Sequence, residues 1–167
     1  DEPSVPGDPA TLVYMDGMTP SKLLKAVSKG HVIVARYITM EVYFLFENKK
    51  YLPGDRMEIT GDSEFENDIV ASVTIKINEE TYGKNIIPEL YLIENGVKRE
   101  VWLEKRDERT YMADVVTNWH TIEWEWKRFE VLSKDYGFLG YVNPIFHGRK
   151  KSKLKTFGEA VQLWRGQ

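Results

Sequence analysis

The hydrophobic pattern changes its period near residue 31 and so separates a helical segment from a long β-rich segment. Over residues 19–29, three apolar side chains recur at the spacing of one helical face: Leu23, Leu24 and Val27. Thr19 is a favourable N-cap, and Pro20 suits the first helical position, where no amide hydrogen is needed. Gly30 can adopt the left-handed conformation that ends a helix. The pattern therefore predicts one short helix over residues 19–30.

From residue 31 onward, apolar and polar residues alternate, and turn residues interrupt the alternation at short intervals. The clearest strand covers residues 69–78, where five apolar side chains fall on one face: Ile69, Ala71, Val73, Ile75 and Ile77. Turns are expected in three short segments that contain glycine together with proline, asparagine or aspartate: residues 52–55 (LPGD), 95–96 (NG) and 135–137 (DYG). This apolar-in, polar-out pattern is typical of half-buried antiparallel strands.

The strand expected over residues 121–132 changes the phase of its alternation halfway along. Its first half has apolar residues on one face, Ile122, Trp124 and Trp126, and glutamates on the other, Glu123 and Glu125. Beyond residues 127–128 the apolar residues fall on the parity of the glutamates. A β-bulge there would restore a single apolar face. We therefore expect the two tryptophans in the core and the two glutamates on a solvated face.

These segments predict an all-β fold, an antiparallel immunoglobulin-like β-sandwich of about seven to nine strands. No helix long enough for the crossovers of a parallel sheet is expected between residues 33 and 146. A capping box at residues 156–159 predicts a short C-terminal helix in addition to the N-terminal one. The predicted organisation is a leader and connecting helix (1–30), a β-sandwich domain (31–146), and a basic tail with a short helix (147–167).

Charge argues against a nucleic-acid binder. The 167 residues carry a net charge of −3, although residues 149–155 hold five lysines and arginines and no acid. The remaining body is therefore acidic, whereas nucleic-acid binding requires a basic face on the folded body. No apolar run approaches the roughly 20 residues of a membrane span, so we expect a soluble domain. The acidic, proline-rich start without an initiator methionine favours a fragment of a longer protein rather than a signal peptide.

No self-sufficient catalytic or metal site is evident in the sequence. There is no cysteine, and the three histidines, His31, His120 and His147, do not stand at metal-ligand spacings. Phosphate-binding glycine motifs and the Gly-x-Ser-x-Gly turn are absent. The acidic loop at residues 62–68 could bind calcium, but it lacks the glycine and terminal glutamate of a helix-loop-helix calcium site. We interpret this loop as solvated.

Aromatic residues leave one alternative function open. Five of them could form a flat surface that stacks on sugar rings: Trp102, Trp119, Tyr82, Tyr91 and Tyr136. Carbohydrate-binding modules are frequently β-sandwiches of this size. The alternative interpretation is therefore a glycan-binding module, or a surface-adhesion domain without catalytic activity.

Four segments together resemble one family. In order, they are residues 23–34 (LLKAVSKGHVIV), 52–55 (LPGD), 89–97 (ELYLIENGV) and 138–146 (FLGYVNPIF). The set is similar to the C-terminal region of metal-dependent phosphoesterases of the PHP (polymerase and histidinol phosphatase) superfamily, in its CehA/McbA-like branch. In that family a (β/α)-barrel metal domain ends in a helix and is followed by a β-sandwich.

The resemblance implies a non-catalytic accessory domain that aids substrate access or assembly. The family's metal-binding His-x-Asp-x-His motif has no counterpart in this sequence, so no catalytic residue and no cofactor are expected in this chain. The divalent metal would belong to a catalytic domain upstream of Asp1. Expected partners are that upstream domain or a second copy of the chain, which Leu23, Leu24 and Val27 would contact.

Overall fold

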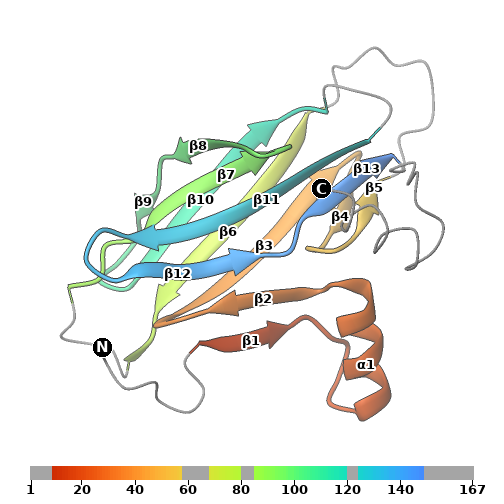
Figure 1. Cartoon of the computed structure of the whole chain (residues 1–167), viewed down its shortest axis with the longest axis horizontal. Helices are drawn as coiled ribbons and strands as arrows, with labels where there is room; N and C mark the ends of the chain where they lie inside the picture. The colour runs from red at the N-terminus through yellow and green to blue at the C-terminus, as the bar shows by residue number, and fades with distance from the viewer. Residues whose placement is uncertain (1–8, 58–67, 80–84, 120–123, 149–167) are drawn as a thin grey trace, which may run out of the picture.

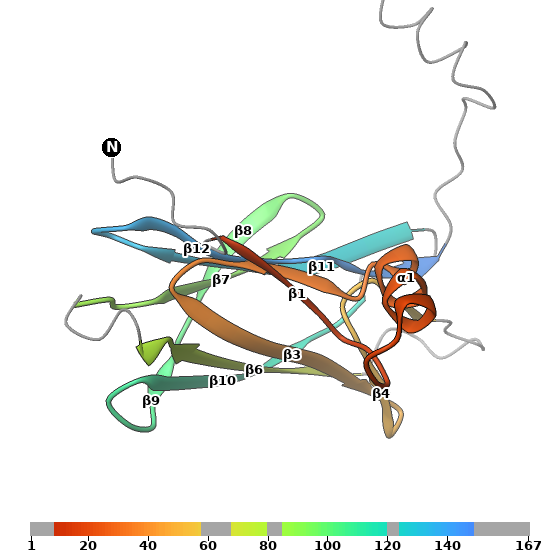
Figure 2. The ribbon, with the colours of Figure 1, turned by 90° about the horizontal axis from the view of Figure 1, so that it is seen from below.

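Two sheets pack face to face in the computed structural model, which describes residues 9–57, 68–79, 85–119 and 124–148 (Figures 1 and 2). One sheet has eight strands and the other has five, and all pairs but one are antiparallel. The expected β-sandwich is confirmed at this level. The described strands number thirteen, more than the seven to nine expected, because several are edge strands of two or three residues.

The eight-stranded sheet has β11 at its centre. On one side β11 pairs with β7, which pairs with β8; on the other it pairs with β12 and β13 in succession. β12 continues to β2 and β1, and β13 pairs in parallel with β5. The strands are β1 (Ala10–Val13), β2 (Val32–Ala35), β5 (Arg56–Met57), β7 (Glu89–Glu94), β8 (Val97–Val101), β11 (Trp124–Ser133), β12 (Gly137–Val142) and β13 (Ile145–Gly148).

The five-stranded sheet has β6 at its centre, which confirms the strand expected over residues 69–78. The five apolar residues of its inner face are all buried. Its strands, in spatial order, are β4 (Lys49–Tyr51), β3 (Ile38–Phe46), β6 (Ile69–Ile77), β10 (Thr110–Thr117) and β9 (Glu104–Lys105). Phe44 of this sheet stacks on Phe129 of the other, 5.9 Å between ring centroids, in the core between them.

The helix α1 (Pro20–Lys29) begins and ends where the sequence predicts. The Thr19 hydroxyl accepts a hydrogen bond from the Lys22 amide, and Gly30 takes φ 78° in the left-handed region. Among the described residues, no helix has the length and apolarity that crossing a membrane requires. The C-terminal helix expected after residue 156, and residues 62–67 of the acidic loop, lie outside the described residues.

The faces expected for the first half of the strand at residues 121–132 are wrong: the two tryptophans predicted to face the core face outward, and Glu125, predicted to face solvent, faces inward. Burial alternates without interruption along β11, so that Glu125, Lys127 and Phe129 face the core. Trp124 and Trp126 lie half-buried on the outer face of the sheet. There is no bulge at residues 127–128; the register with β12 shifts instead farther along the strand. The hydrophobic pattern fails here because it assigns charged residues to solvent, whereas Glu125 and Lys127 have polar partners inside the sandwich.

Candidate functional site

Three segments far apart in the sequence meet at the C-terminal end of α1, at a place we call the joint, formed by Gly30, Gly54 and Asn143. The Asn143 side-chain amide donates to the Gly30 carbonyl at 2.9 Å. The Gly54 amide donates to the Pro144 carbonyl, also at 2.9 Å. A Cβ atom on Gly54 would stand 2.5 Å from the Gly30 carbonyl carbon, so only glycine fits there. The joint therefore fixes α1 to the turn before β5 and to the break between β12 and β13.

A contact between a histidine and an aspartate lies beside the joint. The Asp55 carboxylate contacts His31 Nε2 at 2.8 Å, and its second oxygen accepts a hydrogen bond from the Leu52 amide at 2.8 Å. His31 is buried at the entry to β2, so this pair ties the turn to the first residue after the helix. His31 is thus a structural residue here. Within the described ranges, no three His, Cys, Asp or Glu side chains gather in a way that could hold a metal ion.

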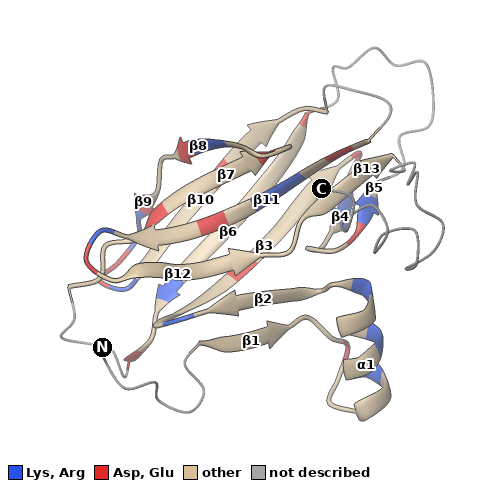
Figure 3. Cartoon of the chain, viewed as in Figure 1, with Lys and Arg blue, Asp and Glu red and all other residues tan. Residues whose placement is uncertain are grey.

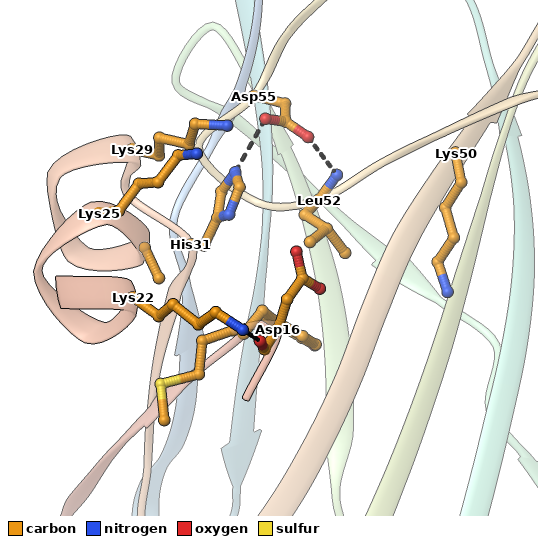
Figure 4. Close-up of a pocket in the computed structure, with 11 residues that line it drawn as sticks. Asp16, Lys22, Lys25, Lys29, His31, Lys50, Leu52 and Asp55 are labelled. Atoms are coloured by element: carbon orange, nitrogen blue, oxygen red, sulfur yellow. Dashed lines mark hydrogen bonds and ion pairs between the residues drawn. The ribbon is translucent and has the colours of Figure 1, made fainter. Parts of the chain in front are cut away.

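An open pocket of about 580 Å³ lies between α1 and the turn that carries Asp55 (Figure 4). The His31–Asp55 pair and Leu52 line one part of it, and Asp16 and Lys50 line others. Figure 4 shows the lysine side chains of α1 reaching from the helix into this space. The pocket volume is in the range of small-molecule sites.

One face of α1 is basic and turns toward the pocket. Lys22, Lys25 and Lys29 follow the spacing of a single helical face and all line the pocket, beside the buried Ala26. The Lys22 ammonium donates to the Asp16 carbonyl. Lys25 and Lys29 form no ion pair with any residue in the described part of the chain. The sequence analysis missed this face, although the lysine spacing was a readable signal.

The opposite face of α1 is apolar and exposed. Leu23 is 41% exposed, Leu24 70% and Val27 49%, and Met18 just before the helix is 90% exposed. A surface helix normally packs its apolar stripe against its own domain and presents charges to solvent. Here the orientation is reversed. The apolar residues predicted to contact a partner are therefore available on the surface of this chain.

The aromatic residues considered for sugar binding lie in different environments. Trp102 is 86% exposed, whereas Trp119 is buried and contacts the His147 ring, 5.3 Å between centroids. Tyr136 packs edge-on against Tyr37 at 5.9 Å. Tyr91 lies on the outer face of the eight-stranded sheet under the Lys98 ammonium, and Tyr82 lies outside the described residues. The four described residues do not share one flat face.

Other aromatic residues do meet on the outer face of the eight-stranded sheet. Trp124 lies beside Phe146, with 6.4 Å between ring centroids and 30° between planes. The Arg128 guanidinium lies 3.9 Å from the Tyr141 ring centroid and 5.7 Å from that of Trp126. The arginine therefore covers part of the aromatic surface through cation–π contacts.

A charged cluster spans the two sheets at one end of the core. Lys127, only 1% exposed, places its ammonium 2.6 Å from Glu94 Oε1, and the Thr117 hydroxyl of the other sheet also donates to Glu94. Burial by itself would raise the pKa of Glu94. Hydrogen bonds from Lys127, Thr117 and Arg99 outweigh that effect and lower the pKa to about 2. We interpret this cluster as a structural link between the sheets.

Comparison with known proteins gives no assignment: no family model, no curated protein and no solved structure matches this chain.

Proposed function

We propose that this chain is the non-catalytic accessory domain of a metal-dependent hydrolase of the PHP type, with an immunoglobulin-like sandwich that follows the catalytic domain. In this proposal the divalent metal and its ligands belong to a domain upstream of Asp1. The chain's own contribution is to position that domain through the apolar face of α1, and thereby to shape substrate access.

The observation that carries the proposal is the joint. Three of the four segments that resemble the family supply its residues: Gly30 from residues 23–34, Gly54 from residues 52–55, and Asn143 from residues 138–146. Each motif by itself is common among β-sandwiches. In this chain the three motifs contact one another, and together they hold α1 on the sandwich. Their contacts therefore give a structural reason for the three motifs to occur together.

The exposed apolar face of α1 gives the second argument. Leu23, Leu24 and Val27 lie on the helix that, in the family, leads from the catalytic barrel into the sandwich. Full burial of an exposed Leu or Val side chain contributes roughly 1.5–3 kcal/mol. Leu24 would gain most of that, whereas Leu23 and Val27, which are already about half buried, would gain about half. A neighbouring domain seated on this face would gain that stabilisation, and the sandwich has no other element that covers it among the described residues.

The test extends the coding sequence upstream of Asp1 and compares two proteins, the extended chain and the 167-residue chain. We expect a His-x-Asp-x-His motif in the extension and manganese- or zinc-dependent hydrolysis of a phosphodiester by the extended protein only. Metal-dependent turnover by the 167-residue chain alone would contradict the proposal, as would an upstream region without the metal motif.

A further inference from the structure

We propose that the pocket between α1 and the Asp55 turn binds a compact polyanion, a small molecule that carries two or more phosphoryl or carboxylate charges. The site belongs to this chain alone and does not depend on the proposed function.

Charge is the first argument. Four lysines line the pocket against two aspartates, in a chain whose net charge is −3. Every charged residue of α1 is a lysine, and Figure 3 shows them as the blue segments of that helix. Like charges at helical spacing repel one another, so a bound anion would stabilise the helix as well as the contact.

The second argument is that some charged side chains of the pocket already have partners within the chain, whereas two lysines have none among the described residues. The Asp55 carboxylate contacts His31 and accepts a hydrogen bond from the Leu52 amide, and no lysine of the described residues lies within ion-pair distance of it. The Lys22 ammonium is held by the Asp16 carbonyl. Lys25 and Lys29 have no ion-pair partner among the described residues, and both reach toward the His31–Asp55 pair in Figure 4. An anion that enters the pocket would therefore meet the unpaired ammonium groups of Lys25 and Lys29 beside the His31–Asp55 pair.

The third argument distinguishes a small ligand from a protein partner. The basic face and the apolar face are on opposite sides of α1, and the basic face looks into the open pocket between the helix and the domain's own turn. A protein surface can dock on the apolar face without entering this space. A volume of about 580 Å³ suits a molecule with a few phosphate or carboxylate groups.

The experiment titrates the isotopically labelled chain at low ionic strength with pyrophosphate and, separately, with citrate, and follows backbone amide shifts by NMR. We expect saturable shifts at Lys25, Lys29 and His31. The double variant Lys25→Gln/Lys29→Gln should weaken binding by at least about tenfold, since two ammonium–anion contacts are lost. Glutamine keeps a good helix propensity, so α1 should persist.

The matched control is Lys105→Gln/Lys134→Gln, which removes the same charge from β9 and from the turn between β11 and β12. Figure 1 shows these two elements at the end of the sandwich away from α1. This variant should bind as the wild-type chain does. Binding of both anions would indicate a site for charge, and binding of pyrophosphate alone would indicate a phosphoryl site. The proposal fails if neither anion gives saturable shifts at these residues, or if the two double variants lose affinity equally.

Discussion

At the scale of single residues, the charged cluster of Lys127, Glu94 and Thr117 makes specific predictions about stability. Lys127 is 1% exposed, and the carboxylate of Glu94 is its partner in the same sheet. A buried pair gives modest net stability, but removal of one partner leaves the other charge uncompensated. The Thr117 hydroxyl joins the cluster from β10, so the pair also connects the two sheets.

Replacement Lys127→Met should therefore lower the free energy of unfolding by roughly 3 kcal/mol, because Glu94 loses its buried cation. The double variant Lys127→Met/Glu94→Gln should be more stable than the single one. Urea denaturation measures both. The control is Lys98→Met, which breaks an outer-face pair with Glu130 (2.9 Å) and should change stability by less than about 1 kcal/mol. Strictly additive effects of the two substitutions would contradict this account.

The low pKa of Glu94 predicts how stability depends on pH. Its pKa falls from an ordinary value of 4.5 to about 2 in the folded chain, so the unfolded chain binds the proton more readily. The contribution of this group is present above pH 4.5 and is lost as pH falls toward about 2. We expect the stability difference between wild type and Glu94→Gln, measured by urea denaturation, to shrink across that interval. A difference that is constant with pH would exclude this role for Glu94.

At the scale of elements, local patterns predicted α1 and β6 well, because in both the apolar spacing agrees with the burial that the fold requires. β11 shows where such patterns fail. Its inner face includes Glu125 and Lys127, whose partners Asn95 and Glu94 come from the β7–β8 hairpin about thirty residues earlier. No local rule links these residues. The joint was missed for the same reason, since its Asn143–Gly30 contact unites segments more than a hundred residues apart. The pocket residues are closer in sequence, from Tyr14 to Asp55, but the contact that shapes the pocket, His31 to Asp55, still joins residues 24 positions apart.

Substitution of Gly54 tests the packing of the joint. Gly54→Ala should destabilise the chain clearly more than Gly96→Ala, although the two residues have nearly the same backbone angle, φ 91° and 94°. Both substitutions carry the roughly 1–2 kcal/mol penalty of a left-handed non-glycine residue. Only at Gly54 would the new Cβ also collide with the backbone of Lys29 and Gly30; at Gly96 nothing lies within 4 Å. Thermal unfolding compares the two variants, and equal losses would show that the joint is not closely packed.

At the scale of the whole molecule, the described sandwich has its single helix at one edge, as Figure 2 shows, with the apolar side of that helix uncovered. An exposed apolar ridge of this kind favours association. In the chain alone, the available partner is a second copy.

The double variant Leu24→Glu/Val27→Glu should therefore leave the stability of the chain within about 0.5 kcal/mol, because neither side chain is buried. It should reduce any concentration-dependent self-association measured by sedimentation velocity. In the extended protein, the same variant should separate the two domains in limited proteolysis. A large loss of stability in the isolated chain would mean that this face packs against the sandwich after all.

The joint also has a mechanical meaning. The C-terminal end of α1 is attached both to the turn before β5 and to the break between β12 and β13. We therefore expect the helix to keep a fixed orientation relative to the sandwich. A domain bound to the apolar face of α1 would then be held in one orientation relative to the sandwich. A ligand bound in the pocket would contact the basic face of α1 and restrict the motion of the helix further. Its binding would therefore also affect a partner bound to the apolar face of the same helix.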